Sequence, residues 1–212
     1  MGEFKHIGIM GGTFDPVHIG HLILAELAIC ELSLDHVLFL PTGDPPHKKN
    51  RQLTSAQKRL DMLQLALEGN PSFSISTIEL KRQGTTYSYD SLLELKGLYP
   101  DGTRLTYIIG SDTLLELKNW KSFNLVASLC DFAVYERPGI DRSDLRAEAD
   151  RLEASYQAKV CFIKGPVISL SSSEIRQRVA HNKTIRYLVP ERVFKYINKE
   201  RLYRGESSND KA

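Results

Sequence analysis

The sequence predicts an α/β protein, with a doubly wound, mainly parallel sheet that carries helices on both faces. Short apolar runs alternate with segments of helical periodicity along most of the chain. The apolar runs are continuous, as in strands that are buried on both faces. This order of elements requires crossover connections between parallel strands, and sheets of this kind bind ligands beyond the carboxyl ends of their strands.

The first unit is a strand, a glycine turn and a helix. The run His6–Met10 is apolar and leads into the pair Gly11-Gly12. The apolar residues that follow have helical rather than alternating spacing: Leu22, Leu24, Ala25, Leu27, Ala28 and Ile29. A helix is therefore expected to begin shortly after the glycines.

A second strand and a second helix come next. The strand is expected over His36–Leu40, closed by Pro41, and the polar stretch Pro45–Lys49 is expected to be a loop. Thr54 and Gln57 have the spacing of a capping box at a helix start, and Gly69-Asn70-Pro71 ends that helix.

The rest of the chain continues the alternation. Strands are predicted over 73–78, 105–109, 132–135 and 160–163, and helices over 89–98, 114–129 and 143–156. With 212 residues, 42% of them hydrophobic, the chain is long enough for one sizeable core, so we expect a single domain over residues 1–204. The polar end, residues 205–212, is expected to be a disordered tail.

Charge and cysteine content exclude several classes of protein. The formal net charge of +2 is far from the basic excess of a protein that coats nucleic acid. Cys30, Cys130 and Cys161 are odd in number and widely spaced, which favours reduced thiols in a cytoplasm. No apolar run is long enough for a membrane span, and no signal peptide is apparent. A homo-oligomer is possible, but the sequence does not determine one.

Two common phosphate-binding motifs do not fit the early glycines. A nucleoside-triphosphate loop needs Lys-Ser or Lys-Thr after its last glycine, whereas Thr13-Phe14-Asp15 follows here. The dinucleotide fingerprint needs three glycines at other spacings and an acidic residue after the second strand, and this strand ends in Leu40-Pro41. NAD is therefore not expected as a cofactor.

The segment after the glycine pair carries two histidines, His18 and His21, at the expected helix start. Their spacing allows both imidazoles to face one point. Backbone N–H groups and the positive end of the helix dipole would meet there, which suits phosphate oxygens. The competing interpretation is that both are capping or core histidines.

The context of the histidines resembles a known family. The stretch Thr13-Phe14-Asp15-Pro16-Val17-His18-Ile19-Gly20-His21 is similar to the signature of the nucleotidyltransferase superfamily, and its last four residues spell the HIGH motif. The resemblance implies a Rossmann-like fold and an ATP site.

A second motif lies far along the chain. Ser171 and Glu174 form a capping box, and by itself the segment Ser169–Arg176 could be only a well-capped amphipathic helix. Three hydroxyls, open N–H groups and Arg176 also suit an anion, and the superfamily has a Ser-Ser/Thr-x-Ile-Arg motif here for the ATP phosphates.

The resemblance implies transfer of AMP from ATP to the phosphate of a mononucleotide, with release of pyrophosphate. Since a phosphate nucleophile is already ionised near neutral pH, catalysis depends on alignment and on charge stabilisation at the α-phosphate. The expected catalytic residues are His18, His21 and Arg176. Mg²⁺ is expected to enter with ATP, bound by phosphates and water rather than by a protein metal site. The expected ATP-binding residues are Gly11, Gly12, Thr13, Phe14, His18, His21, Gly110, Asp112, Ser171, Ser172, Ser173 and Arg176.

The acceptor is indicated by Trp120, the only tryptophan. A lone tryptophan is usually a packing residue, but nicotinate mononucleotide carries a cationic pyridinium ring, which an indole face binds well. The stretch Gly110–Trp120 resembles the nicotinate-nucleotide adenylyltransferase branch, in which the Asp lies by the bound nucleotide and the Trp stacks on nicotinate.

Three further stretches resemble that branch: 45–48, 84–88 and 137–139. By analogy, Lys48 binds substrate phosphate and the amides of Thr86 and Tyr87 meet the nicotinate carboxylate. Arg137 either holds phosphate or caps a strand. The acceptor residues are therefore expected to be Lys48, Thr86, Tyr87, Trp120 and Arg137.

Three alternatives remain. Another phosphorylated acceptor, such as nicotinamide mononucleotide, phosphopantetheine or a cytidylyl-transfer substrate, would use the same superfamily. An RNA-binding or synthetase-like module would need a Lys-Met-Ser-Lys-Ser-type loop and a basic stripe. A non-catalytic nucleotide sensor would bind ATP without turnover.

Overall fold

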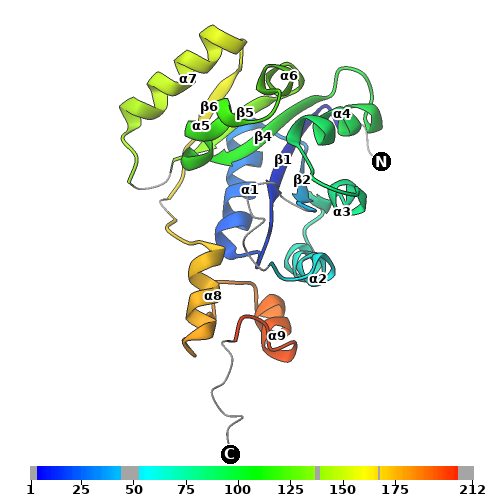
Figure 1. Ribbon diagram of the computed structural model, residues 1–212, viewed down its shortest axis with the longest axis vertical. Coiled ribbons are helices and arrows are strands. Elements are labelled where there is room, and N and C mark those ends of the chain that lie inside the picture. Colours follow the sequence, from blue (N-terminus) through cyan, green and yellow to red (C-terminus); the bar gives the residue numbers. More distant parts are fainter. Residues whose placement is uncertain (1–3, 44–52, 137–138, 167, 205–212) are drawn as a thin grey trace, which may run out of the picture.

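The computed structural model describes residues 4–43, 53–136, 139–166 and 168–204. These residues form a six-stranded sheet in the order β3-β2-β1-β4-β5-β6, and every pairing is parallel (Figure 1). The strands are β1 (His6–Gly12), β2 (His36–Pro41), β3 (Phe73–Ile75), β4 (Arg104–Gly110), β5 (Asp131–Tyr135) and β6 (Val160–Ile163). The strand order reverses direction between β1 and β4, the place where doubly wound sheets bind ligands. The predicted fold class is confirmed.

The helices connect these strands and extend beyond them. They are α1 (Ile19–Leu32), α2 (Ala56–Leu67), α3 (Ile78–Lys81), α4 (Ser88–Leu98), α5 (Ser111–Glu116), the 3₁₀ turn η2 (Leu117–Asn119), α6 (Phe123–Leu129), α7 (Arg142–Tyr156), α8 (Ser172–Ala180) and α9 (Glu191–Lys199). In Figure 1, α8 and α9 lie together below the sheet, next to one end of α1.

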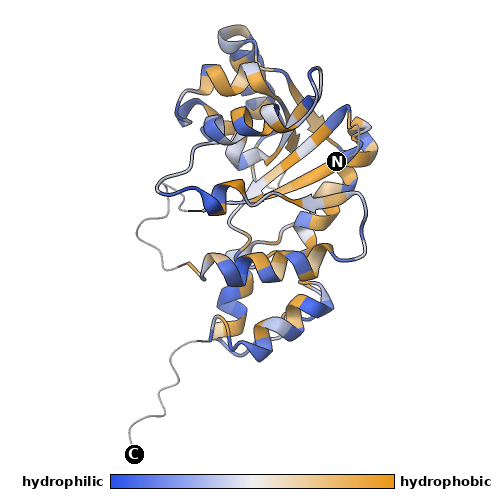
Figure 2. Cartoon of the chain, turned by 90° about the vertical axis from the view of Figure 1, so that its right-hand side faces the viewer, coloured by the Kyte–Doolittle hydropathy of each residue, from blue (hydrophilic) through white to orange (hydrophobic). Residues whose placement is uncertain are grey.

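Two hydrophobic clusters lie on the two faces of the sheet. Successive strand residues point to opposite faces, so Ile9 joins one cluster and Met10 the other. The cluster that contains Met10 also includes residues of α1, α2, α8 and α9, and the cluster that contains Ile9 includes residues of α4, α5, α6 and α7. Figure 2 shows the strands as mostly hydrophobic, with helices of mixed hydropathy around them. The continuous apolar runs of the sequence therefore reflect burial on both sides.

Most predicted elements are confirmed, but three details were wrong. The strand predicted over 73–78 ends at Ile75, and Ile78 already begins α3. The helix predicted over 114–129 is three pieces, α5, η2 and α6, and Ser122, with a positive φ of 56°, separates α6 from the two pieces before it. The cap of α2 is Ser55, which accepts a hydrogen bond from the Lys58 N–H at 3.4 Å, and not Thr54.

Some predictions fall on residues outside the described ranges. They are the loop around Lys48, Arg137 and the polar end 205–212. The division into one domain over 1–204 and a tail stays a prediction, as does the location in the cell. None of the helices in the described part of the chain is long and apolar enough to cross a membrane.

Candidate active site

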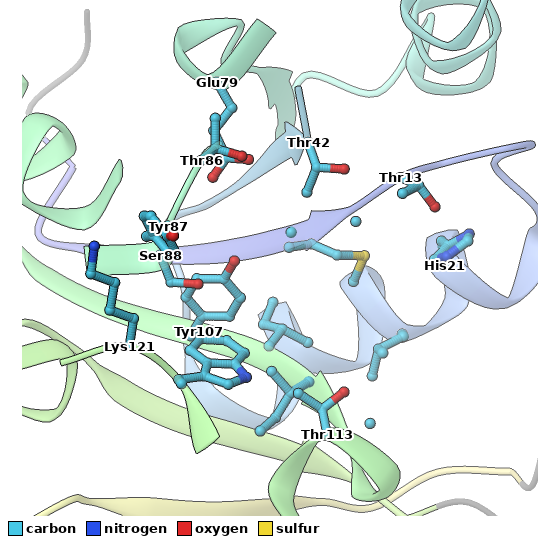
Figure 3. A pocket seen from close by; sticks show the side chains of 18 residues that line it. Thr13, His21, Thr42, Glu79, Thr86, Tyr87, Ser88, Tyr107, Thr113 and Lys121 are labelled. Atoms are coloured by element: carbon cyan, nitrogen blue, oxygen red, sulfur yellow. The ribbon is translucent and has the colours of Figure 1, made fainter. Parts of the chain in front are cut away.

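A cavity of about 390 Å³ lies at the carboxyl ends of β1 and β4, where the strand order reverses. Its wall includes Gly11, Gly12, Thr13 and His21 from the β1–α1 segment and Gly110 and Thr113 from the β4–α5 segment. Figure 3 shows Thr13 and His21 at one end of the cavity and Tyr87, Ser88 and Lys121 at the other. The cavity thus has two ends with different side chains.

The glycine turn is shaped by a close contact with β4. A Cβ atom on Gly11 would lie only 2.2 Å from the hydroxyl oxygen of Tyr107, so only glycine fits beside this side chain. Thr13, the residue after the glycine pair, is held by Arg59 of α2. Its guanidinium, only 2% exposed, donates hydrogen bonds to the carbonyls of Thr13 at 2.8 Å and Thr42 at 2.9 Å. Arg59 thereby ties the ends of β1 and β2 together.

His18 and His21 lie face to face at the start of α1. Their ring centroids are 3.7 Å apart with an angle of 26° between the planes. The His18 N–H donates a hydrogen bond to Nδ1 of His21 at 3.2 Å, so in a neutral ring the proton is on Nε2. His21 lines the cavity, whereas His18 is only 4% exposed and lies behind it. The pair therefore presents one donor to the cavity and buries the other ring.

Phe14 supports the pair from the core. Its ring meets the His21 ring edge to face at 5.1 Å and is 1% exposed. The Phe14 backbone has a positive φ of 48°, which is uncommon for a residue with a side chain. Its side chain therefore positions His21 and does not line the cavity.

The first turn of α1 is less open than the sequence suggested. The Ile19 N–H donates to the Leu188 carbonyl and the His21 N–H to the His18 carbonyl, both at 3.0 Å. The expectation that backbone N–H groups at this helix start are free for a ligand is therefore wrong for Ile19 and His21. The Ile19 N–H is occupied because the segment before α9 packs against the helix start.

The serine and arginine motif lies directly against the histidine loop. The Ser172 hydroxyl donates to the Pro16 carbonyl at 2.8 Å, and the Arg176 guanidinium donates to the Asp15 carbonyl. Arg176 also donates to the Ser173 hydroxyl at 2.9 Å, and Ser171 caps α8 by accepting from the Glu174 N–H at 3.1 Å. The two distant motifs are brought together, but all three hydroxyls already have protein partners.

The buried Asp15 side chain connects the histidine loop to α8 and to the segment after α9. Its carboxylate is 1% exposed, accepts a 2.7 Å hydrogen bond from the Tyr203 hydroxyl, and lies 4.0 Å from the Arg176 guanidinium. Burial is the main cause that raises the pKa of Tyr203, and the Asp15 charge adds to it. Tyr203 therefore stays a hydrogen-bond donor, and the loop is held by contacts from α2, from α8 and from the segment after α9.

The opposite end of the cavity is formed by the segment before α4. Thr86, Tyr87 and Ser88 all line the wall there, and Tyr87 is the N-cap residue of α4. Glu79 also lines this wall; it is 4% exposed and accepts a 2.7 Å hydrogen bond from the Ser91 hydroxyl. Burial raises the pKa of Glu79, although hydrogen bonds from Ser91 and Thr86 oppose this shift. Glu79 thus connects Thr86 to the first turn of α4.

Trp120 lies where η2 ends. The main-chain N–H of Trp120 donates to the Leu117 carbonyl at 3.0 Å. The indole ring meets the Tyr107 ring edge to face, with 5.5 Å between the ring centroids. The indole lines the cavity, together with the neighbouring Lys121. Asp112, in the first turn of α5, is exposed and is not part of the cavity wall.

Several residues of the site were not predicted from the sequence. Thr42, Glu79, Ser88, Tyr107 and Lys121 line the cavity, and Arg59, Asp15 and Tyr203 hold the histidine loop. Arg59 shares the helical spacing of the buried Met62 and Leu63, and a charged residue in such a stripe is the one signal that could have drawn attention to it. Among the described residues, no group of three or more His, Cys, Asp and Glu side chains could hold a metal ion.

The cavity at the reversal of the sheet and the paired histidines are those of a nucleotide-transferring α/β protein, and comparison with known families agrees. The model of the family described as "Cytidylyltransferase-like" matches residues 9–178. This match includes both the histidine loop and the start of α8.

The relatives narrow the class. A protein of Thermoanaerobacter sp. (strain X514) is 41% identical over 96% of each chain, and one of Thermomicrobium roseum is 46% identical over 94% of this chain and 92% of its own. Both carry the name "Probable nicotinate-nucleotide adenylyltransferase". The chain therefore belongs to the nicotinate-nucleotide adenylyltransferase family, within the cytidylyltransferase-like class.

Solved structures share the fold. The Plasmodium falciparum nicotinic acid mononucleotide adenylyltransferase complexed with APC superimposes with a TM-score of 0.73 at 21% identity, over 94% of this chain and 97% of the other. The same enzyme complexed with NaAD gives the same TM-score. At this identity, the likeness supports the fold.

Proposed function

We propose that this protein transfers AMP from ATP to nicotinate mononucleotide, which gives nicotinate adenine dinucleotide and pyrophosphate in NAD biosynthesis. The observation that carries the proposal is that one cavity is lined by both His21 and Trp120. A phosphate site and an aromatic site are thus joined by a continuous space, as the union of a nucleotide and a pyridine ring requires. Family membership supports the same reaction.

In the proposed reaction, a phosphate oxygen of the acceptor attacks the α-phosphorus of ATP. The new P–O bond forms as the bond from the α-phosphorus to the bridging oxygen breaks, and pyrophosphate leaves. Nε2–H of His21 would donate to an α-phosphate oxygen as charge grows there, with His18 holding the ring through its main-chain N–H. The imidazole orientation is set before the substrate arrives, which favours the transition state.

Arg176 and the α8 start are proposed to hold the β- and γ-phosphates. Arg176 is half-buried, its two hydrogen-bond acceptors, the Asp15 carbonyl and the Ser173 hydroxyl, are uncharged oxygens, and the Asp15 carboxylate lies 4.0 Å away. A triphosphate oxygen is a stronger partner for guanidinium than either. The hydroxyls of Ser171, Ser172 and Ser173 would have to exchange partners to take part. Gly11, Gly12, Thr13, Phe14, Gly110 and Asp112 complete the proposed ATP site, Phe14 through its backbone.

At the acceptor end, Trp120 is proposed to stack on the pyridinium ring, and the N–H groups of Thr86 and Tyr87 to meet the carboxylate. The Glu79–Ser91 hydrogen bond supports this role because it holds the segment before ATP or acceptor binds. Lys48 and Arg137 are proposed phosphate ligands on the strength of the family resemblance alone.

Mg²⁺ is proposed to enter with ATP. The described residues offer no cluster of carboxylates and imidazoles as a cage, and this donor set fits an ion that the triphosphate oxygens and water hold. Bound in that way, Mg²⁺ would neutralise charge on the leaving pyrophosphate.

The test is pyrophosphate release from ATP and Mg²⁺ with nicotinate mononucleotide, nicotinamide mononucleotide and phosphopantetheine offered separately. Release with the first and much slower release with the others is expected. Faster release with phosphopantetheine would assign another acceptor, and ATP binding without release in any arm would identify a nucleotide sensor.

A further inference from the structure

Lys121 brings a positive charge to the acceptor end of the cavity. Its ammonium nitrogen lies 4.1 Å from the centroid of the Tyr87 ring, and both side chains line the cavity (Figure 3). Among the described residues that line this cavity, Lys121 is the only lysine or arginine. The acceptor end therefore contains one permanent cation.

The backbone of Lys121 is held on both sides. Before it, the Trp120 ring packs on Tyr107, and the main-chain N–H of Trp120 donates a hydrogen bond to the Leu117 carbonyl. After it, Ser122 turns the chain with φ of 56°, and Phe123 is 4% exposed and packs at 5.7 Å against Phe132 in β5. The Lys121 side chain is long and exposed, but it starts from a fixed place.

The partner of Lys121 is equally well placed. Tyr87 caps α4, and its carbonyl accepts a hydrogen bond from the Ser91 N–H at 3.3 Å. The cation–π contact places the ammonium group beside the ring of Tyr87. Within the described residues Lys121 forms no ion pair, so its charge is available to an anionic ligand.

The acid and amide forms of the acceptor differ by one negative charge at this end of the molecule. Backbone N–H groups can donate to a carboxylate or to an amide oxygen, so they give only a small difference in affinity between the acid and the amide acceptor. A lysine ammonium has only donors and carries a charge, so it favours the carboxylate through Coulomb attraction. The buried Glu79 lines the same wall, and the carboxylate of the acid acceptor would bring a second acidic group close to it. A cation between such groups reduces their repulsion.

We propose that Lys121 is a specificity-determining residue, whose ammonium group pairs with the carboxylate of the pyridine ring and so selects the acid acceptor over the amide. The inference rests on the proposed function and adds a side-chain charge to the backbone contacts proposed above.

The experiment compares kcat/KM for nicotinate mononucleotide and nicotinamide mononucleotide in the wild type, Lys121→Met and Lys121→Arg. The acid-to-amide ratio should fall about tenfold in Lys121→Met and stay within about twofold of the wild type in Lys121→Arg. Lys118→Met is the matched control, because Lys118 is an exposed lysine of η2 that does not line the cavity, and its ratio should not change.

A binding measurement gives an independent readout. Quenching of Trp120, the sole tryptophan, reports acceptor binding without turnover, and the acid-over-amide preference should decline as salt rises from about 0.05 to 0.5 M because charges near the surface are screened. Lys121→Met should have little of this salt dependence.

The outcomes are distinct. A wild type that releases no pyrophosphate with nicotinate mononucleotide refutes the proposed function. An active wild type whose acid-to-amide ratio is the same in Lys121→Met refutes this inference alone. An equal loss with both acceptors in Lys121→Met also overturns it, because Lys121 would then bind a group that the two share, such as the phosphate.

Discussion

The Tyr203 hydroxyl donates a 2.7 Å hydrogen bond to the Asp15 carboxylate, and so joins the segment after α9 to the loop that carries the paired histidines. Arg176 contacts the same loop from α8, and Arg59 holds it from α2. The loop therefore depends on residues that lie far from it in sequence.

Removing the Tyr203 hydroxyl should weaken this brace. Tyr203→Phe leaves a carboxylate that is 1% exposed with one partner fewer, so the free energy of unfolding should fall by about 1–3 kcal/mol. We also expect kcat to drop several-fold, because His21 is less well held. Urea denaturation and steady-state rates measure both. Tyr187→Phe is the control, since Tyr187 is 83% exposed and its variant should match the wild type; equal stability of the two variants would contradict the brace.

His21 should act through Nε2. His21→Ala is expected to lower kcat by about 10²- to 10³-fold while nicotinate mononucleotide still binds, as for loss of a transition-state donor. Because Nδ1 already accepts from the His18 N–H, His21→Gln, whose amide nitrogen reaches the Nε2 position, should keep more activity than His21→Asn. Rapid-quench single-turnover rates are the measurement. Asn matching or exceeding Gln would assign the role to the other nitrogen.

Trp120 should contribute to binding of the acceptor and not of ATP. Trp120→Ala is expected to raise KM for nicotinate mononucleotide at least tenfold with little change in KM for ATP, and Trp120→Phe should recover part of the loss because an aromatic face remains. Its edge-to-face contact with Tyr107 requires a check of the melting temperature in both variants. A selective rise in KM for ATP would show that the indole does not face the acceptor.

The stability of the fold should depend on pH through His36. This side chain is 5% exposed, lies 4.6 Å from the Phe4 ring, and has its Nε2 2.6 Å from the Ser74 hydroxyl. Burial lowers the pKa of His36 below its ordinary value of 6.5. A lowered pKa means that the unfolded chain takes up the proton first, so the contribution to stability is complete above about pH 6.5 and is lost as pH falls toward the folded-state pKa.

The measurement is the melting temperature at several pH values between 5 and 8. The wild type should lose more stability below pH 6.5 than His36→Gln does. His6 acts in the same direction, because burial also lowers its pKa, so a part of the loss should persist in the variant. His181→Gln, a change at an exposed position, should follow the wild type. A parallel pH dependence in wild type and His36→Gln would refute the assignment.

Local patterns predicted the elements well where one physical cause dominates. Continuous apolar runs correspond to β1, β2, β4, β5 and β6, because strands buried on both faces have no polar alternation. The break at Ser122 was missed, since serine carries no strong helix-ending signal and the backbone there turns to place Phe123 in the core. Similarly, β3 ends at Ile75, and Ile78, which the prediction placed in the strand, begins α3.

By itself the sequence determined the fold class, the histidine motif at the start of α1 and the capped start of α8, because these depend on periodicity and on spacing within short segments, and the resemblance of its motifs indicated the family. Only the tertiary structure decided that Arg59 and Tyr203 hold the histidine loop, that the serine hydroxyls already have partners, and that Lys121 lies over Tyr87. The physical reason is that the contacts of Arg59, Tyr203, Ser172 and Lys121 join residues that lie far apart in the sequence. Their meeting follows from the packing of helices on both faces of the sheet, which no local pattern records.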